Sequence, residues 1–171
     1  MTPVTHPPQE SRPMLGTPSP SSTADREIVL SRVVDAPREL VFDAWTDPVH
    51  VEQWWGPEGF STRVHQMEVK PGGMWRFLLT GPDGTEFPNR ITYREVTRPE
   101  RLVYRHDSDV DDDPMAFEVT VTFEAQGQKT RLTMRSVFLS AQACEKVKSF
   151  GAVALGQQTL AKLDAFVQRP R

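Results

Sequence analysis

Hydrophobic and small residues near the end of the chain recur at steps of three and four, which is the spacing of one helix face. They are Val147, Phe150, Val153, Gly156, Leu160, Leu163 and Val167. Ser140 precedes this stripe and suits an N-cap, because its hydroxyl can accept a hydrogen bond from a free backbone N–H of the first turn. The pattern therefore predicts one long amphipathic helix over Ser140–Val167.

Most of the chain before this helix alternates hydrophobic and polar positions with a period of two, which is typical of half-buried β-strands. The clearest case is residues 117–124, where Phe and Val alternate with Glu and Thr. Turn sequences of hairpin length separate such stretches, and links this short require antiparallel pairing. The first strand is expected at residues 26–34, and the second begins near Ser61.

Two helix-start signals lie between the first and second strands. Asp35-Ala36-Pro37 and Thr46-Asp47-Pro48 each place a capping side chain beside a proline, whose missing N–H costs nothing in a first helical turn. The predicted order is therefore β-α-α-β-β-β-β-β-β-α. We expect an α+β fold in which a curved antiparallel β-sheet wraps around a long C-terminal α-helix, with two short helices between strands 1 and 2.

The N-terminal residues differ in composition from the rest of the chain. Residues 1–24 contain six prolines among several Ser and Thr, so they offer little to bury and few positions for a helix or a strand. We expect a disordered tail over residues 1–24 and a single domain over residues 25–168, which is long enough for a sizeable core.

Composition and charge narrow the classes of function. A net charge of −3 argues against a nucleic-acid partner, which favours a concentrated basic surface. No run approaches the ~18 apolar residues that span a bilayer, and the N-terminus lacks the basic-then-apolar order of a signal peptide. The single cysteine, Cys144, excludes an intrachain disulfide. We expect a cytoplasmic protein without a nucleic-acid or membrane partner, and a homodimer remains open.

A series of short motifs runs through the expected domain. They read RVVDAP at 32–37, VFDAWTDP at 41–48, QWWGP at 53–57, KPGGMWRF at 70–77, PDG at 82–84 and RPERL at 98–102. Together they resemble the activator-of-heat-shock-protein-90-ATPase homologue family, within the START/Bet v 1-like (SRPBCC) superfamily. The resemblance implies a helix-grip fold with a deep pocket between helix and sheet for an apolar or aromatic small molecule. It implies no shared catalytic residues, because members range from binders to cyclases and other enzymes.

One stretch of the last helix departs from the family pattern. Many relatives carry a Gly-Trp pair midway along it, where this chain has Ala154-Leu155-Gly156. A smaller residue there enlarges the interior or alters the mouth of the expected pocket. The ligand of a relative therefore cannot be assigned directly to this chain. We expect Gly151 and Gly156 to reflect close packing on the sheet, and space for a ligand is the alternative.

The candidate ligand-binding residues combine inward-facing strand positions, the tryptophan pair before Gly56 and two residues of the last helix. They are Trp54, Trp55, His65, Trp75, Phe77, Tyr93, Tyr104, His106, Phe117, Phe138, Phe150 and Leu155. Aromatic side chains commonly form the walls of ligand pockets, although the same residues also serve as ordinary core. The first hypothesis is therefore a protein that binds an apolar or aromatic small molecule in a cavity between the C-terminal helix and the sheet.

A catalytic use of the same cavity, as a cyclase, dehydratase or hydrolase, is the second hypothesis. His65 and His106 are the candidate acid–base groups, since an unperturbed imidazole pKa lies near 6.5. Tyr93 and Tyr104 are the candidate hydroxyl donors to a ligand carbonyl. No Ser, Cys or carboxylate pattern completes a catalytic set, so a hydrogen-bonded core histidine is the favoured interpretation of each imidazole. A third hypothesis, a co-chaperone-like module for a heat-shock protein 90 homologue, rests on the family name alone.

The aspartates within residues 107–113 do not predict a metal site. They lack the ordered spacing and the terminal Glu of a calcium loop, and no histidine or cysteine pair has the spacing of metal ligands. We expect an exposed acidic loop, no metal and no cofactor.

Overall fold

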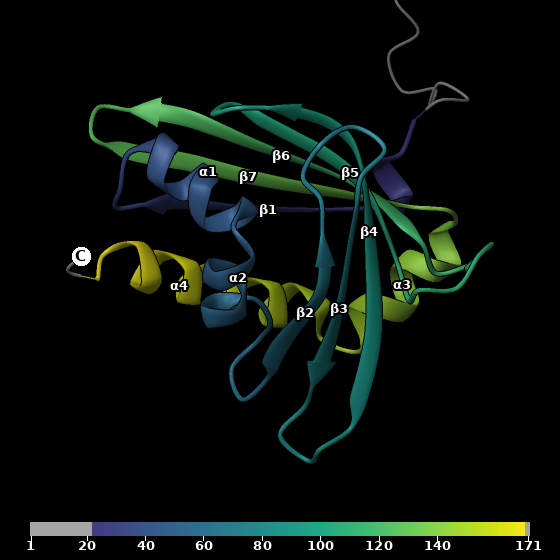
Figure 1. Ribbon diagram of the computed structural model, residues 1–171. Coiled ribbons are helices and arrows are strands. Elements are labelled where there is room, and N and C mark those ends of the chain that lie inside the picture. Colours follow the sequence, from purple (N-terminus) through teal and green to yellow (C-terminus); the bar gives the residue numbers. More distant parts are fainter. Residues whose placement is uncertain (1–21, 170–171) are drawn as a thin grey trace, which may run out of the picture.

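The computed structural model describes residues 22–169, in which one curved antiparallel sheet wraps around the C-terminal helix (Figure 1). The sheet has seven strands in the order β1-β7-β6-β5-β4-β3-β2. The elements are η1 (Ala24–Arg26), β1 (Glu27–Val34), α1 (Arg38–Thr46), α2 (Pro48–Trp54), β2 (Ser61–Met67), β3 (Met74–Thr80), β4 (Glu86–Thr97), β5 (Arg101–Asp107), β6 (Phe117–Gln126), β7 (Lys129–Phe138), α3 (Ala141–Ser149) and α4 (Ala152–Val167). The expected α+β helix-grip fold is confirmed.

Most of the expected tail, residues 1–21, lies outside the described part of the chain. The next residues already contact the domain, since Thr23 Oγ1 donates to Glu27 Oε2 over 2.8 Å.

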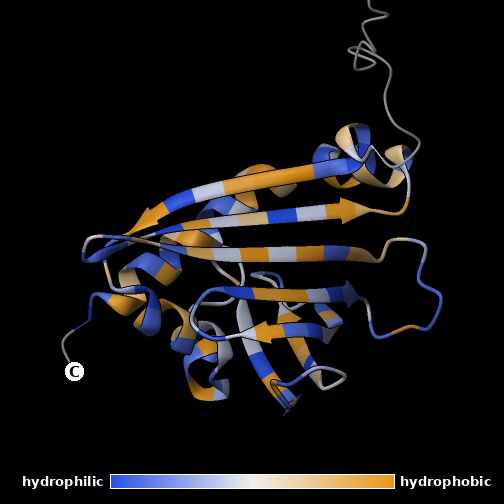
Figure 2. Cartoon of the chain, turned by 90° about the horizontal axis from the view of Figure 1, so that it is seen from above, coloured by the Kyte–Doolittle hydropathy of each residue, from blue (hydrophilic) through white to orange (hydrophobic). Residues whose placement is uncertain are grey.

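β1, from the start of the chain, forms one edge of the sheet beside β7, the last strand. It pairs antiparallel with β7, with Glu27 opposite Val137, whereas β2 to β7 follow one another as antiparallel neighbours. β1 and β2 therefore form the two edges, and α1 and α2 cross between them. Hydrophobic and hydrophilic residues alternate along the strands in Figure 2, as expected for a sheet with one buried face.

The prediction of a single continuous C-terminal helix is wrong, because the helix is interrupted between α3 and α4. Gly151 adopts a left-handed φ of 82°, a conformation that glycine reaches without steric cost. Ser140 caps α3 as expected, its hydroxyl accepting from the backbone N–H of Ala143. The break turns part of the hydrophobic stripe outward, so that Phe150 is 69% and Val153 45% exposed.

Close packing on β1 explains the second helical glycine. A Cβ on Gly156 would lie 2.5 Å from Cδ1 of Leu30, well inside van der Waals contact. Further along α4, the buried carboxylate of Asp164 accepts from Arg32 Nε (3.0 Å) and from the backbone N–H of Asp35 (3.1 Å). These contacts hold α4 against the start of the sheet and favour the packing interpretation of Gly156.

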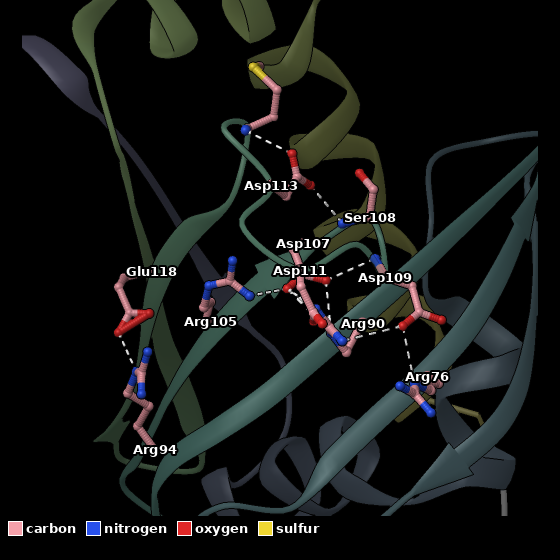
Figure 3. Close-up of polar contacts among 11 residues, drawn as sticks. Arg76, Arg90, Arg94, Arg105, Asp107, Ser108, Asp109, Asp111, Asp113 and Glu118 are labelled. Carbon is pink, nitrogen blue, oxygen red and sulfur yellow. Dashed lines mark hydrogen bonds and ion pairs between the residues drawn. The ribbon is translucent and has the colours of Figure 1, made fainter.

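The acidic loop after β5 is only partly exposed, contrary to the prediction. Asp107 is 3% exposed, and its carboxylate accepts from the guanidinium groups of Arg90 and Arg105 (Figure 3). Asp113, 8% exposed, accepts from the backbone N–H groups of Ser108 and Met115. The aspartates therefore shape the loop through ion pairs and turn hydrogen bonds, and no group of His, Cys, Asp and Glu within residues 22–169 has a metal-binding arrangement.

Candidate functional site

An apolar hollow lies between α4, the loop that joins α2 to β2, and the adjoining strands. Its inner chamber has a volume of about 160 Å³ and is lined by residues that include Trp45, Trp55, Met134, Gly156 and Leu160. Its outer chamber has a volume of about 680 Å³ and is lined by residues that include Phe60, Phe87, Asn89, Phe150 and Leu155. Pro57 and Leu79 belong to the walls of both chambers, so the two adjoin.

Hydrogen bonds from α4 hold the α2–β2 loop over the hollow. Lys162 Nζ donates to the carbonyl oxygens of Gly56 (3.0 Å) and Pro57 (3.3 Å). One turn earlier in α4, Gln158 Oε1 accepts from the backbone N–H of Glu58 at 3.2 Å. Because the ammonium lies against the loop carbonyls, it is partly buried, and this burial lowers the pKa of Lys162.

The two tryptophans expected at the pocket mouth have different surroundings. Trp55 lines the inner chamber, and its ring packs against Trp45 (5.6 Å between centroids) and Trp75 (4.8 Å). Trp54 is fully buried, and its indole N–H donates to the carbonyl of Ala44 over 2.9 Å, so it belongs to the core under α1. Of this pair, only Trp55 is a candidate to touch a ligand.

The inward aromatic residues of the sheet lie behind the chamber walls. Trp75, Phe77, Tyr93, Tyr104 and Phe138 are each no more than 3% exposed, and none of them belongs to the recorded lining of either chamber. Phe117 stacks on Phe138 with 4.9 Å between ring centroids. The structure thus places most of these candidates in the core, and Trp55, which lines the inner chamber, packs directly against Trp75 and Phe77.

His65 points away from the hollow, which corrects its place among the cavity and catalytic candidates. A β-bulge falls at this position, since Val64 pairs with Phe77 while Gln66 pairs with Arg76. Before the bulge the even-numbered residues face inward, and after it Met67 lies opposite the buried Trp75. His65 shares the parity of Met67 in the sequence, yet the bulge leaves its side chain exposed.

His106 faces inward on β5, as its parity indicates. Its Nε2 lies 2.7 Å from Oδ1 of Asn89, and its ring lies 4.8 Å from that of Phe117. Burial lowers the pKa of this imidazole from 6.5 to about 4, so it is neutral at physiological pH. Within residues 22–169 its side-chain partner is an amide, neither a tyrosine nor a carboxylate.

Several buried polar side-chain atoms have no partner among the described residues. They are the Nε1 atoms of Trp45 and Trp75, Nδ1 of His50 and the hydroxyls of Tyr93 and Tyr104. Burial raises the pKa of both tyrosines well above the usual value of 10, so both hydroxyls stay protonated and able to donate. The sequence suggests these tyrosines as donors, and the structure shows that they do not reach solvent.

The sequence missed most of the residues that line the chambers. The sequence predicts that Leu79 and Leu160 face inward, yet only as core, and their spacing carries no sign of a hollow. Phe60 and Phe87 lie in or beside turns, where no periodicity points to a wall. Phe150 and Leu155, two of the cavity candidates, line the outer chamber on either side of a helix break that the sequence pattern does not predict.

Comparison with known proteins identifies the family to which this chain is similar. The family model described as Activator of Hsp90 ATPase homolog 1-like protein matches residues 35–168. No curated protein matches the chain significantly. None of the helices within residues 22–169 has the length and hydrophobicity that crossing a bilayer requires.

Solved structures of bacterial proteins share the fold. A protein from Arthrobacter aurescens superimposes with a TM-score of 0.80 at 24% identity, covering 87% of this chain and 90% of its own. One from Nitrosomonas europaea gives 0.76 at 21% identity, covering 85% and 96%. An AHSA1-like protein from Aeromonas hydrophila gives 0.66 at 19% identity, covering 83% and 92%. Identities this low establish the shared fold alone.

Proposed function

The chain belongs to the Activator of Hsp90 ATPase homolog 1-like family, and from this premise we propose that it binds an apolar or aromatic small molecule between α4 and the sheet. The observation that carries the proposal is the hollow with two adjoining chambers. The outer chamber, at about 680 Å³, falls within the roughly 300–1,000 Å³ that is typical of ligand sites.

The energetics of the inner chamber support an occupant. The inner chamber is a partly open hollow of about 160 Å³ with an almost entirely apolar lining. Its walls include the side chains of Trp45, Trp55, Met134 and Leu160, and an apolar occupant would gain dispersion contacts with them.

The mouth of the outer chamber gives a second reason. Phe150 is 69% and Phe87 44% exposed, and both belong to its lining. Aromatic side chains held at the surface around a hollow gain free energy when an apolar molecule covers them. Lys162 fixes the Gly56–Pro57 segment beside them, so the entrance is framed by a defined loop.

The catalytic hypothesis has less support. An acid–base role for His106 requires a pKa near the working pH, whereas burial holds this imidazole near 4. His65 is exposed on the far side of β2. The co-chaperone hypothesis still rests on the family name.

The test is binding of the uncharged fluorescent probe N-phenyl-1-naphthylamine to the full chain, followed by titration with competing aromatic compounds. We expect saturable binding that Leu79→Trp weakens strongly, because Leu79 lines both chambers and a larger side chain there obstructs the place where they adjoin. Leu78→Trp is the matched control, since the neighbouring residue of β3 points to the opposite face.

Binding that is absent from the wild-type chain, or equal in the two tryptophan variants, would refute the proposal. Where the probe binds as expected, native mass spectrometry of gently purified protein, with denaturing extraction of any adduct, identifies the class of the natural ligand.

A further inference from the structure

The side chain of Asn89 is held from two sides in the wall of the outer chamber. Its Nδ2 donates to the carbonyl oxygen of Phe87 over 2.8 Å, and its Oδ1 lies 2.7 Å from Nε2 of His106. A backbone carbonyl oxygen only accepts, so the first bond settles which end of the amide is the nitrogen. The amide of Asn89 therefore has a fixed orientation in the ligand-free protein, which lowers the cost of binding to it.

Each end of this amide keeps one unused hydrogen-bonding position. An amide nitrogen carries two hydrogens and an amide oxygen has two lone pairs. The side-chain hydrogen bonds of Asn89 within residues 22–169 use one of each. Asn89 is half-buried and belongs to the chamber lining, so the wall offers one donor and one acceptor side by side.

His106 supports Asn89 from behind. Its imidazole is not among the residues that line either chamber. Burial lowers the pKa of this imidazole to about 4, so near pH 7 it donates to Oδ1 of Asn89 as a neutral group and adds no charge to the wall. Asn89 is thus the group that faces a ligand, and His106 is its positioning residue.

Polar side chains are concentrated at one end of the hollow. In the inner chamber, the hydroxyl of Thr159 already donates to the carbonyl of Leu155 over 3.2 Å. The outer chamber adds the side chains of Glu86, Asn89 and Ser108 to its wall. A ligand that fills both chambers therefore places its apolar end in the inner one and a polar group beside Asn89.

The walls also define the charge of that polar group. The described residues that line the two chambers include the carboxylate of Glu86 and no Lys, Arg or His. The ammonium of Lys162 is bound to the carbonyls of Gly56 and Pro57. A carboxylate or phosphate beside Asn89 would lose hydration without gaining a cation, whereas a neutral group has no such cost.

Resting on the proposed function, we propose that Asn89 determines specificity by binding a neutral group of the ligand that both donates and accepts hydrogen bonds, namely a hydroxyl or a carboxamide. The ligand class is thus an amphipathic alcohol, phenol or amide. Its apolar body extends past Leu79 into the inner chamber.

The first test is direct, because Asn89 is the single asparagine of the chain. Wild-type protein made with ¹⁵N-labelled asparagine gives one pair of side-chain NH₂ signals in an NMR spectrum. We expect 2-naphthol to move one proton signal of this pair downfield of its position with naphthalene. The two probes share the same ring system, so the difference between them reports the hydroxyl.

The second test compares affinities by displacement of N-phenyl-1-naphthylamine from the full chain. We expect 2-naphthol to bind about fivefold to tenfold more tightly than naphthalene, the value of one net hydrogen bond of about 1 kcal/mol. Asn89→Leu should abolish this preference, and His106→Phe should reduce it without changing the affinity for naphthalene. 2-Naphthoate should bind more weakly than 2-naphthol, because its carboxylate meets no cation in the lining.

Thr92→Val is the matched control, since it removes a polar atom from the opposite face of the same strand and should keep the preference for 2-naphthol. Equal affinities for 2-naphthol and naphthalene, with coinciding Asn89 signals, overturn this inference and leave the proposed function intact. An unchanged preference in His106→Phe overturns the positioning role. Failure of all three naphthalene probes and of N-phenyl-1-naphthylamine to bind overturns the proposed function and this inference together. The NMR measurement uses wild-type protein, so it decides even where the variants fold poorly.

Discussion

The imidazole of His106 donates from Nε2 to Oδ1 of Asn89 across 2.7 Å. Because an amide oxygen only accepts, this bond selects the neutral tautomer with its hydrogen on Nε2. Asn89 belongs to the lining of the outer chamber, and the ring of Phe117 packs 4.8 Å from that of the imidazole. The histidine thus serves as a neutral polar support for one wall residue of the hollow.

Stability should fall as the pH drops from about 6.5 to about 4, in part through His106. Its pKa is near 6.5 in the unfolded chain and about 4 in the folded one, so in this window the unfolded state binds more protons and gains stability. Asp107 and Asp113 attract the charged imidazole, but burial outweighs them. The expected contribution is on the order of 2–3 kcal/mol.

Urea unfolding of wild type and His106→Phe at several pH values between 4 and 7 measures this contribution. The variant should lose stability more gently on acidification, while His65→Gln, at an exposed site, should keep the wild-type slope. Equal slopes for wild type and His106→Phe would show that the folded imidazole protonates freely.

Gly156→Ala should destabilise the protein by about 1–3 kcal/mol, the usual cost of overpacking. The added methyl group would lie 2.5 Å from Cδ1 of Leu30. Leu30→Ala removes that atom, so the double variant should be more stable than the sum of the two single changes implies. Chemical denaturation of all four proteins gives the coupling energy, and additive effects would contradict the contact.

Asp107→Ala should cost about 3–5 kcal/mol, because it leaves the charge of Arg90 without its buried partner. The side chain of Asp107 is 1% exposed and that of Arg90 is 11% exposed, and the two lie 2.9 Å apart (Figure 3). Glu118→Ala breaks the pair with Arg94, whose side chains are 46% and 55% exposed, and should cost less than about 1 kcal/mol. Similar losses of melting temperature in the two variants would contradict this distinction.

Tyr104→Phe should leave the stability of the ligand-free protein unchanged or slightly raise it, since the deleted hydroxyl has no described partner. Thr130→Val should cost about 1–3 kcal/mol, because it leaves the buried carbonyl of Ala36 without its 2.7 Å donor. Both changes remove one buried oxygen, so the comparison isolates its hydrogen bonding. A loss in Tyr104→Phe equal to that in Thr130→Val would mean that the tyrosine hydroxyl is already satisfied.

Sequence reasoning recovered the fold wherever local patterns decide it. The period-two alternation around Phe117 to Phe123 and the helix-start signals before α1 and α2 predict elements that the structure confirms. Asp47 caps α2 as expected, whereas the N-cap of α1 is Pro37 and no side chain caps that helix. The inward direction of His106 also follows from simple parity. These features depend on residues within a few positions of one another, so the sequence carries them directly.

The hollow depends on contacts between segments that lie far apart in the sequence. The bulge that turns His65 outward is set by pairing with β3, and the burial of Asp107 by guanidinium groups on β4 and β5. The chambers form where a helix broken at Gly151 crosses the sheet, and their walls come from α1, the α2–β2 loop, β3, β4, the loop after β5, β7, the α3–α4 break and α4.

The sequence by itself determined the α+β order, the antiparallel pairing and the hydrophobic face of each strand, because hydrophobic periodicity and turn chemistry are local. Only the tertiary structure decided which aromatic residues surround the hollow and which fill the core. Trp54 and Trp55 are neighbours in the chain, yet one is bonded into the core and the other lines the inner chamber. Their difference arises from the packing of α4 and β3 around them, and side-chain packing of this kind depends on the whole fold.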